Sequence, residues 1–150
     1  MSDDQGTAMR ADAIIEQAPD ALIFADRAGV VRSWNAAAER IFGHSAAEAV
    51  GQNLDLIVPE QFREAHWAGY ERAVAEGVSK YAGQALPTRA ARSDGEQIYV
   101  ELSFSIAHAE GGEVVGALAM VRDITERFTA DRAERRRVRE LEAELEELRG

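Results

Sequence analysis

The sequence predicts an α+β domain: a five-stranded antiparallel sheet with helices on one face, followed by a C-terminal coiled-coil helix. Three observations predict it. Strand-like runs lie at both ends of the segment 21–122, helical segments are gathered between them, and the chain after residue 122 has no proline and no glycine before Gly150. Helices and strands that are segregated along a chain are typical of antiparallel sheets. The expected order is two strands, three helices and three strands.

The N-terminal part predicts a leader helix and a hairpin. Residues 9–17 are amphipathic and end before the breaker Ala18-Pro19-Asp20, which indicates a short helix. The β-rich runs ALIFAD (21–26) and VVRSWN (30–35) are separated by a turn that contains Gly29. A glycine between two such runs favours a tight hairpin.

The next elements carry helix-capping signals. Asn35 precedes a helical run that closes at Gly43, and Ser45 with Glu48 three residues later forms a capping-box pattern. A longer helix is expected over 60–76, after Pro59.

Three strands are expected at 80–92, 97–108 and 113–122, joined by glycine-containing turns at 93–95 and 110–112. The middle strand alternates cleanly, so its apolar residues share one face. These residues are Ile98, Val100, Leu102, Phe104 and Ile106.

The last segment predicts a helix that pairs with a second copy. Asp123 has the chemistry of a helix cap, and Glu126 follows three residues later. Apolar residues then recur at the 3-4-3 spacing of a coiled-coil seam, at Val138, Leu141, Leu145 and Leu148. The chain is therefore expected to divide into a disordered tail (1–8), a folded domain with its leader helix (9–125) and a C-terminal helix (126–150), and to form a homodimer through its N-terminal and C-terminal helices.

Composition excludes several functions. The formal net charge of −10 opposes binding to nucleic acid and to anionic membranes. The chain has neither a membrane-length apolar stretch nor a signal-peptide region, so a cytoplasmic protein is expected. It contains no cysteine, which excludes thiolate nucleophiles, cysteine-ligated zinc and iron–sulfur clusters. A site must use histidine, carboxylates, hydroxyls or a cofactor.

The element order and the stretches PDALIFADRAGVVRSWNAAAERIFG, EAVGQNL, RSDGEQIYVELSFS and RDITER resemble a PAS domain over about residues 9–127. The resemblance implies a sensor or dimerisation module, not an enzyme. It also implies that Asp123, Ile124 and Thr125 relay a signal from the last strand into the C-terminal helix. Light-sensing PAS relatives that use a cysteine adduct are excluded, since the chain has no cysteine.

The stretch VPEQFREAHWAGY is similar to the proximal helix of heme-binding PAS gas sensors of the FixL and Dos type. The iron-binding histidine of those sensors falls on His66, and the 29-residue interval to Gly95 keeps their register. The resemblance implies a heme b cofactor, a diatomic gas (O2, CO or NO) as ligand, and a downstream effector domain or protein as partner.

Helical spacing is compatible with this site. At 100° per residue, one helix face carries Phe62, His66, Gly69, Tyr70 and Ala73. The two small residues leave room for a flat macrocycle, and neutral imidazole is a common proximal heme ligand. Leu102 and Phe104 are expected on the facing strand.

The distal side departs from the pattern of the oxygen sensors. In their register, the arginine that donates to bound gas falls on Leu86, and the methionine ligand of the Dos type falls on Gln84. We expect an apolar pocket of Leu86, Leu102, Phe104 and Met120, with donors only from Tyr81, Gln84 or Trp67. CO or NO should then be preferred over oxygen, because bound oxygen would lack its hydrogen-bond donor.

Two alternatives stay open. His66 can instead be a core histidine bonded to a backbone carbonyl, in a heme-free PAS domain that senses another small ligand or acts as a dimerisation or protein-interaction module. Trp34 and Trp67 favour packing over stacking on a flavin, and His44 and His108 are expected to face solvent.

Overall fold

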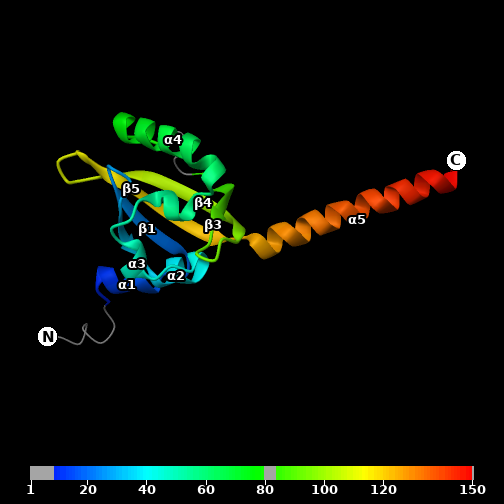
Figure 1. Ribbon diagram of the computed structural model, residues 1–150, viewed down its shortest axis with the longest axis horizontal. Helices are drawn as coiled ribbons and strands as arrows, with labels where there is room; N and C mark the ends of the chain where they lie inside the picture. Colours follow the sequence, from blue (N-terminus) through cyan, green and yellow to red (C-terminus); the bar gives the residue numbers. More distant parts are fainter. Residues whose placement is uncertain (1–8, 80–83, 150) are drawn as a thin grey trace.

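The computed structural model describes residues 9–79 and 84–149. Its five strands form one antiparallel sheet in the order β2-β1-β5-β4-β3, with helical segments over one face and a long helix that projects away from the domain (Figure 1). The predicted fold class and element order are confirmed. The elements are α1 (Ala11–Gln17), β1 (Ala21–Asp26), β2 (Val31–Trp34), α2 (Ala36–Phe42), α3 (Ala46–Ala49), the 3-10 turns η2 (Leu54–Ile57) and η3 (Glu60–Phe62), α4 (Arg63–Glu76), β3 (Leu86–Ala91), β4 (Gln97–His108), β5 (Val114–Asp123) and α5 (Thr125–Arg149).

The β1–β2 hairpin turns at Gly29, as expected. Its φ is +82°, a left-handed conformation that glycine adopts without cost, and the Trp67 ring occupies the space that a side chain would need. The glycine therefore serves both the turn and the close packing of α4 against the hairpin.

Asn35 connects three elements with one buried amide. Its Oδ1 accepts the N–H of Ala38 at 3.1 Å, which caps α2, and the N–H of Leu22 at 3.0 Å. Its Nδ2 donates to the carbonyls of Ile15 at 2.8 Å and Asp20 at 3.1 Å. The capping role was expected, whereas the bonds to α1 and β1 depend on tertiary structure.

The second predicted cap is also present. Ser45 Oγ accepts the Glu48 N–H at 3.2 Å, and the Glu48 carboxylate accepts the Ser45 N–H at 3.0 Å. This reciprocal pair lets α3 exist as a helix of only four residues.

Several boundaries differ from the sequence expectation, most of all those of the helix α4 and the strand β3. The helix expected from residue 60 starts as the turn η3, and α4 begins at Arg63; Gly77, with φ +76°, ends it as expected. The strand expected from residue 80 begins at Leu86, and residues 80–83 lie outside the described part of the chain, as does the tail 1–8.

The helix α5 begins two residues after its expected cap. Asp123 still belongs to β5, and its carboxylate accepts the Thr125 N–H at 2.9 Å. Along its length α5 has no buried residue, and its apolar seam is solvent-exposed, with Leu145 53% and Leu148 84% exposed. In the described part of the chain, no helix combines the length and apolar character that a membrane crossing requires.

Candidate functional site

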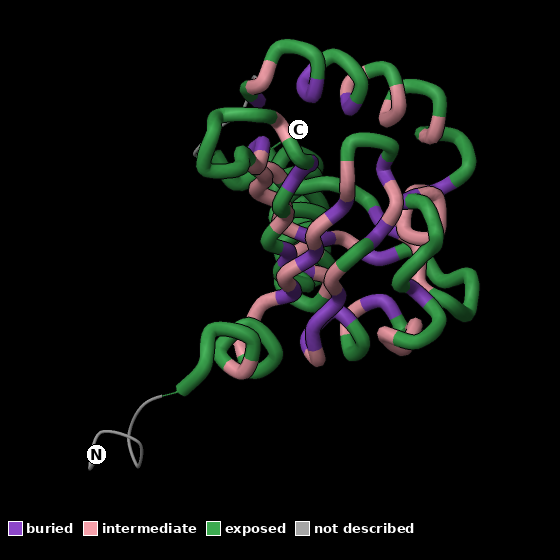
Figure 2. The backbone as a smooth tube through the Cα atoms, turned by 90° about the vertical axis from the view of Figure 1, so that its left-hand side faces the viewer, coloured by how far each residue is buried: buried purple, intermediate pink, exposed green. Residues whose placement is uncertain are grey.

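A cavity of about 830 Å³ lies between α4 and the buried face of the sheet. Figure 2 shows the buried residues of α4 on the side that faces the sheet. The sheet contributes apolar walls, namely Ile23, Ala25, Val100, Leu102, Phe104, Ala117, Ala119 and Val121. The volume falls within the roughly 300–1,000 Å³ that is typical of small-molecule sites.

His66 is a half-buried wall of this cavity. Within the described part of the chain, its Nδ1 is buried and has no hydrogen-bond partner. Burial lowers the pKa of His66 below its usual value of 6.5, and the nearby carboxylate of Asp55 opposes this only in part. The imidazole is therefore neutral at pH 7, the form that binds a metal. A core histidine usually hydrogen-bonds a backbone carbonyl, and Nδ1 of His66 has no such partner among the described residues.

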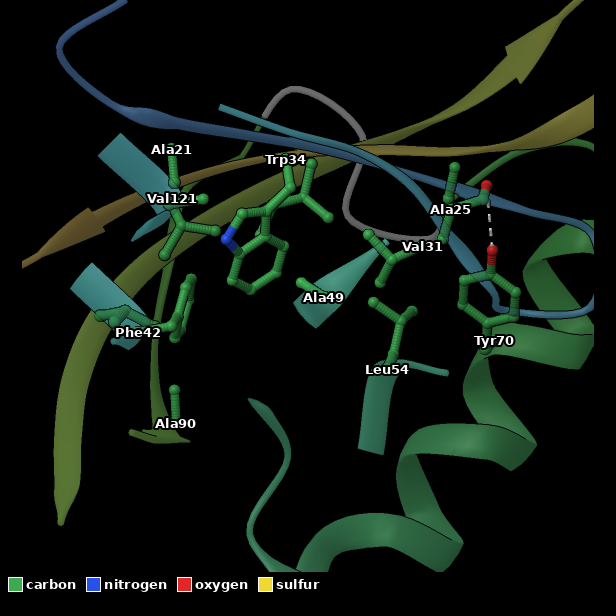
Figure 3. Packing of buried hydrophobic residues seen from close by; sticks show 14 of the residues in the cluster. Ala21, Ala25, Val31, Trp34, Phe42, Ala49, Leu54, Tyr70, Ala90 and Val121 are labelled. Atoms are coloured by element: carbon green, nitrogen blue, oxygen red, sulfur yellow. Dashed lines mark hydrogen bonds between the residues drawn. The ribbon is translucent and has the colours of Figure 1, made fainter. Parts of the chain in front are cut away.

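Tyr70 fixes α4 to β1. Its hydroxyl donates to the Asp26 carbonyl at 2.6 Å and lies 3.5 Å from the Ala25 carbonyl, the contact drawn in Figure 3. Burial, and secondarily the Asp26 charge, raises the pKa of Tyr70 to about 12. The hydroxyl thus stays protonated and bound to backbone, so Tyr70 shapes the cavity through its ring.

Gly69 and Ala73 lie along the same helix face and border the cavity. A Cβ placed on Gly69 would meet no atom within 4 Å. The space that the sequence suggested beside His66 therefore exists. Phe62 also borders the cavity and is 39% exposed.

Two of the four residues expected in the apolar distal pocket border the cavity, and Met120 and Leu86 do not. Leu102 and Phe104 border the cavity, but Met120 lies on the opposite face of the sheet and is 46% exposed. Strand side chains alternate, and in β5 the inward positions belong to Ala119 and Val121.

Other expected distal residues stand apart from the cavity. Leu86 pairs with Leu102 and shares its face of the sheet, yet it is not part of the cavity wall. Gln84 is exposed, and Tyr81 lies outside the described residues. The indole N–H of Trp67 donates to the Asp55 carboxylate at 2.7 Å, so this donor is already used.

Sequence reasoning missed several parts of the wall, among them the residues of β1 and β5, a connector and a group of charged residues. The connector before α4 contributes Leu54, Ile57 and Val58, and its run of apolar residues was the available signal. Two cations, Arg72 and Arg89, also border the cavity, and nothing in the linear sequence distinguished them from surface arginines.

The remaining aromatic and histidine residues pack elsewhere. Trp34 is 4% exposed, and its ring packs against that of Phe42 with the ring centroids 5.5 Å apart. This agrees with the interpretation that Trp34 is a packing residue. His108 is exposed, as expected. The expectation for His44 is wrong, because it is half-buried and its Nε2 is enclosed. In the described ranges, histidine, aspartate and glutamate nowhere gather in threes, although heme iron needs only one such ligand on its proximal side.

The proposed relay residues form the junction between β5 and α5. Ile124 is 6% exposed and donates its N–H to the Tyr99 carbonyl at 2.9 Å. Thr125 Oγ1 accepts the Tyr99 N–H at 3.0 Å. The start of α5 is thereby bonded to β4 as well as continuous with β5.

Curated relatives and solved structures extend this description. The chain is 34% identical over 122 residues to an uncharacterized protein of Azorhizobium caulinodans, which covers 81% of this chain and 16% of the relative. It is 32% identical over 132 residues to sensor protein FixL of Bradyrhizobium diazoefficiens (88% and 25%) and 31% identical over 93 residues to oxygen sensor protein DosP of Escherichia coli (62% and 11%). The chain thus spans a quarter or less of these relatives.

Among solved structures, the PAS domain of a protein from Colwellia psychrerythraea superposes with a TM-score of 0.66 at 25% identity, covering 76% of this chain and 93% of that one. A PAS domain of a LuxR-family regulator from Burkholderia thailandensis, solved with ethanol, gives 0.59 at 16% identity, covering 77% and 98%. The family model described as PAS fold matches residues 15–128. The chain therefore belongs to the PAS-fold family.

Proposed function

We propose that this PAS domain binds heme b through His66 and senses a diatomic gas, with a change in α5 as its output. The observation that carries the proposal is a half-buried histidine, kept neutral by desolvation, in the wall of a largely apolar cavity of about 830 Å³. The similarity to sensor protein FixL and oxygen sensor protein DosP supports it.

The cavity suits the chemistry of heme b. His66 supplies an imidazole for the iron, and the open space beside Gly69 can receive the edge of a planar macrocycle. Arg72 and Arg89 border the same cavity and can pair with the two carboxylates of heme b. When bound, heme supplies an iron that binds O2, CO or NO.

We expect CO or NO to be preferred over oxygen where the gas binds against β4 and β5. Polar stabilisation of oxygen needs a hydrogen-bond donor, and these two strands present Leu102, Phe104 and Ala119. The donors Thr88 and Arg89 border the cavity from the edge strand β3. The hydroxyl of Tyr70 and the indole of Trp67 already donate to Asp26 and Asp55. We expect the ferrous protein to autoxidise quickly in air; slow autoxidation would contradict this preference.

The test is an absorption spectrum of protein expressed with added hemin. The wild type should show a Soret band that His66→Ala abolishes and that imidazole restores in the variant. His44→Ala is the matched control, since His44 is also half-buried but does not border the cavity, and it should keep the band. A colourless wild type would refute heme binding.

A heme-free function is the second candidate. Arg72 and Arg89, which outnumber the one carboxylate of the cavity wall, Glu76, would then favour a small organic anion in the same cavity. Binding of such an anion by a protein that ignores hemin would support this alternative.

The output is proposed to be a change in helix pairing within a homodimer. The α5 seam is exposed, with Val138 48% and Leu141 42% exposed, and α1 exposes Ile14 by 54%. A ligand that shifts the sheet between two packings would act on α5 through Asp123, Ile124 and Thr125. Leu141→Glu with Leu145→Glu should convert a dimer to a monomer in sedimentation; a wild-type monomer would contradict the pairing.

A further inference from the structure

Tyr99 of β4 is the residue against which the first turn of α5 is held. Its backbone bonds Ile124 and Thr125 at 2.9 and 3.0 Å. Its ring stacks on Phe128 of α5, with ring centroids 4.1 Å apart and an interplanar angle of 21°. The orientation of α5 therefore depends on where the Tyr99 ring lies.

Arg89 connects this ring to the cavity. It lies directly opposite Tyr99 in the β3–β4 register. Its guanidinium carbon is 5.9 Å from the centre of the Tyr99 ring and 6.0 Å from that of Phe62. Arg89 and Phe62 both border the cavity. In Figure 1, β3 and the start of α4 lie at the end of the domain from which α5 projects.

The Arg89 contact with the rings is one that a ligand can displace. Arg89 is exposed, and an exposed cation held over an aromatic face is attracted only weakly. A charge-assisted hydrogen bond from a guanidinium to a carboxylate or phosphate is stronger. An anionic group in the cavity mouth would therefore compete successfully for the guanidinium.

We propose that Arg89 is a positioning residue that couples the cavity to α5: an anionic group on the cavity's occupant draws the guanidinium away from the Tyr99 ring, and the packing of Tyr99 against Phe128 changes. This route is separate from the junction of β5 with α5. The proposal holds for any anionic occupant of the cavity. Of the two experiments below, only the one that uses hemin rests on the proposed function.

The first arm uses the ligand-free protein and hydrogen exchange followed by mass spectrometry. Arg89→Ala should raise the exchange rate of residues 125–130 by about 2- to 5-fold and leave β1 (Ala21–Asp26) unchanged. In a Tyr99→Leu background, Arg89→Ala should have no further effect. Unchanged exchange in 125–130, or an equal rise in β1, would overturn the proposal.

The second arm adds hemin. In the wild type, hemin should change the exchange of residues 125–130. Arg89→Ala should bind hemin more weakly, because it loses one partner of the heme carboxylates, and it should lose this response even at hemin concentrations that restore the wild-type Soret intensity. Arg132→Ala is the matched control, because Arg132 lies over the same Phe128 ring at 5.9 Å but does not border the cavity; it should keep the response.

A hemin response that survives in Arg89→Ala would overturn the coupling while leaving heme binding intact. A wild type that ignores hemin would instead defeat the proposed function, and the ligand-free arm would then decide the role of Arg89 by itself.

Discussion

The buried side of the sheet is divided into two unlike halves. Around Asn35, which is 1% exposed, the amide makes four hydrogen bonds to three elements and α2 packs with Ala37 and Ala38 fully buried. Under α4 there is a cavity, an unpartnered His66 Nδ1 and open space beside Gly69. The first half stabilises the fold, and the second leaves room for a ligand beside a histidine.

The largest effect is expected from Asn35→Ala. The change would leave the N–H groups of Leu22 and Ala38 and the carbonyl of Asp20 without their partner, whereas the Ile15 carbonyl still accepts the Ala18 N–H at 3.4 Å. Each buried group that loses its hydrogen bond costs about 1–3 kcal/mol. We expect the free energy of unfolding, measured with urea, to fall by about 3 kcal/mol or more.

Asn35→Asp separates the hydrogen bonds that the Asn35 side chain accepts from those that it donates. Aspartate keeps the acceptor for Leu22 and Ala38 but loses both donors and buries a charge, so it should also destabilise the protein. Ser45→Ala, which removes only an exposed cap, should cost about 1 kcal/mol. If Asn35→Ala were as stable as Ser45→Ala, the hydrogen bonds of Asn35 would not be the main contribution of this half to the free energy of unfolding.

The well-packed half was largely predictable, because its signals are local. The caps at Asn35 and at Ser45 with Glu48 depend on residues three positions apart, and both are present. A local signal also succeeded in the cavity half, where the alternation of β4 placed Leu102 and Phe104 correctly, since successive polar and apolar residues define its two faces.

The cavity half was predicted less completely, for physical reasons. β5 reads VVGALAMVRD, which is apolar on both faces, so only its pairing with β1 and β4 reveals that Ala119 faces inward and Met120 outward. The position of Arg89 over Tyr99 likewise depends on the β3–β4 register. These contacts depend on which strands pair and in which register, and a single sequence does not contain a local signal for either.

A smaller loss is expected from Tyr70→Phe, which removes the bond from α4 to the Asp26 carbonyl. That carbonyl still accepts the Gly29 N–H at 2.9 Å, so we expect a cost of about 1–1.5 kcal/mol in urea unfolding. Tyr99→Phe is the matched control, because the hydroxyl of Tyr99 has no hydrogen-bond partner among the described residues, and it should change little. Equal effects of the two variants would argue against Tyr70 as the anchor of α4.

His66→Leu should stabilise the heme-free protein by about 1 kcal/mol, because an apolar side chain replaces a buried nitrogen without a partner. Thermal and urea unfolding of the apo proteins would measure the gain. The same change must abolish heme binding if His66 is the ligand. A destabilised His66→Leu variant would indicate that the histidine contributes to the fold like any packed core residue.

The pH dependence of stability should follow the same residue. The folded-state pKa of His66 is lowered by burial, so below about pH 6.5 the unfolded chain binds a proton that the folded protein does not. Stability should therefore fall as the pH decreases through 6.5 toward the folded-state pKa. His66→Leu should make the decrease shallower; an unchanged slope between pH 7 and 5 would mean that His66 is not desolvated.

The smallest effect is expected from Gly69→Ala, and it tests whether the space in the cavity half is maintained at the expense of stability. Alanine is favoured over glycine inside a helix by about 0.8–1.0 kcal/mol, and the added methyl group would meet no atom within 4 Å. The unfolding free energy should rise by about that amount.

Gly29→Ala should act in the opposite direction, because Gly29 has φ +82° and lies against the Trp67 ring. A stabilised Gly69→Ala protein that binds its ligand more weakly would show that this glycine leaves space for the ligand. Stabilisation without any loss of binding would restrict the ligand to the part of the cavity beyond Gly69, nearer the sheet.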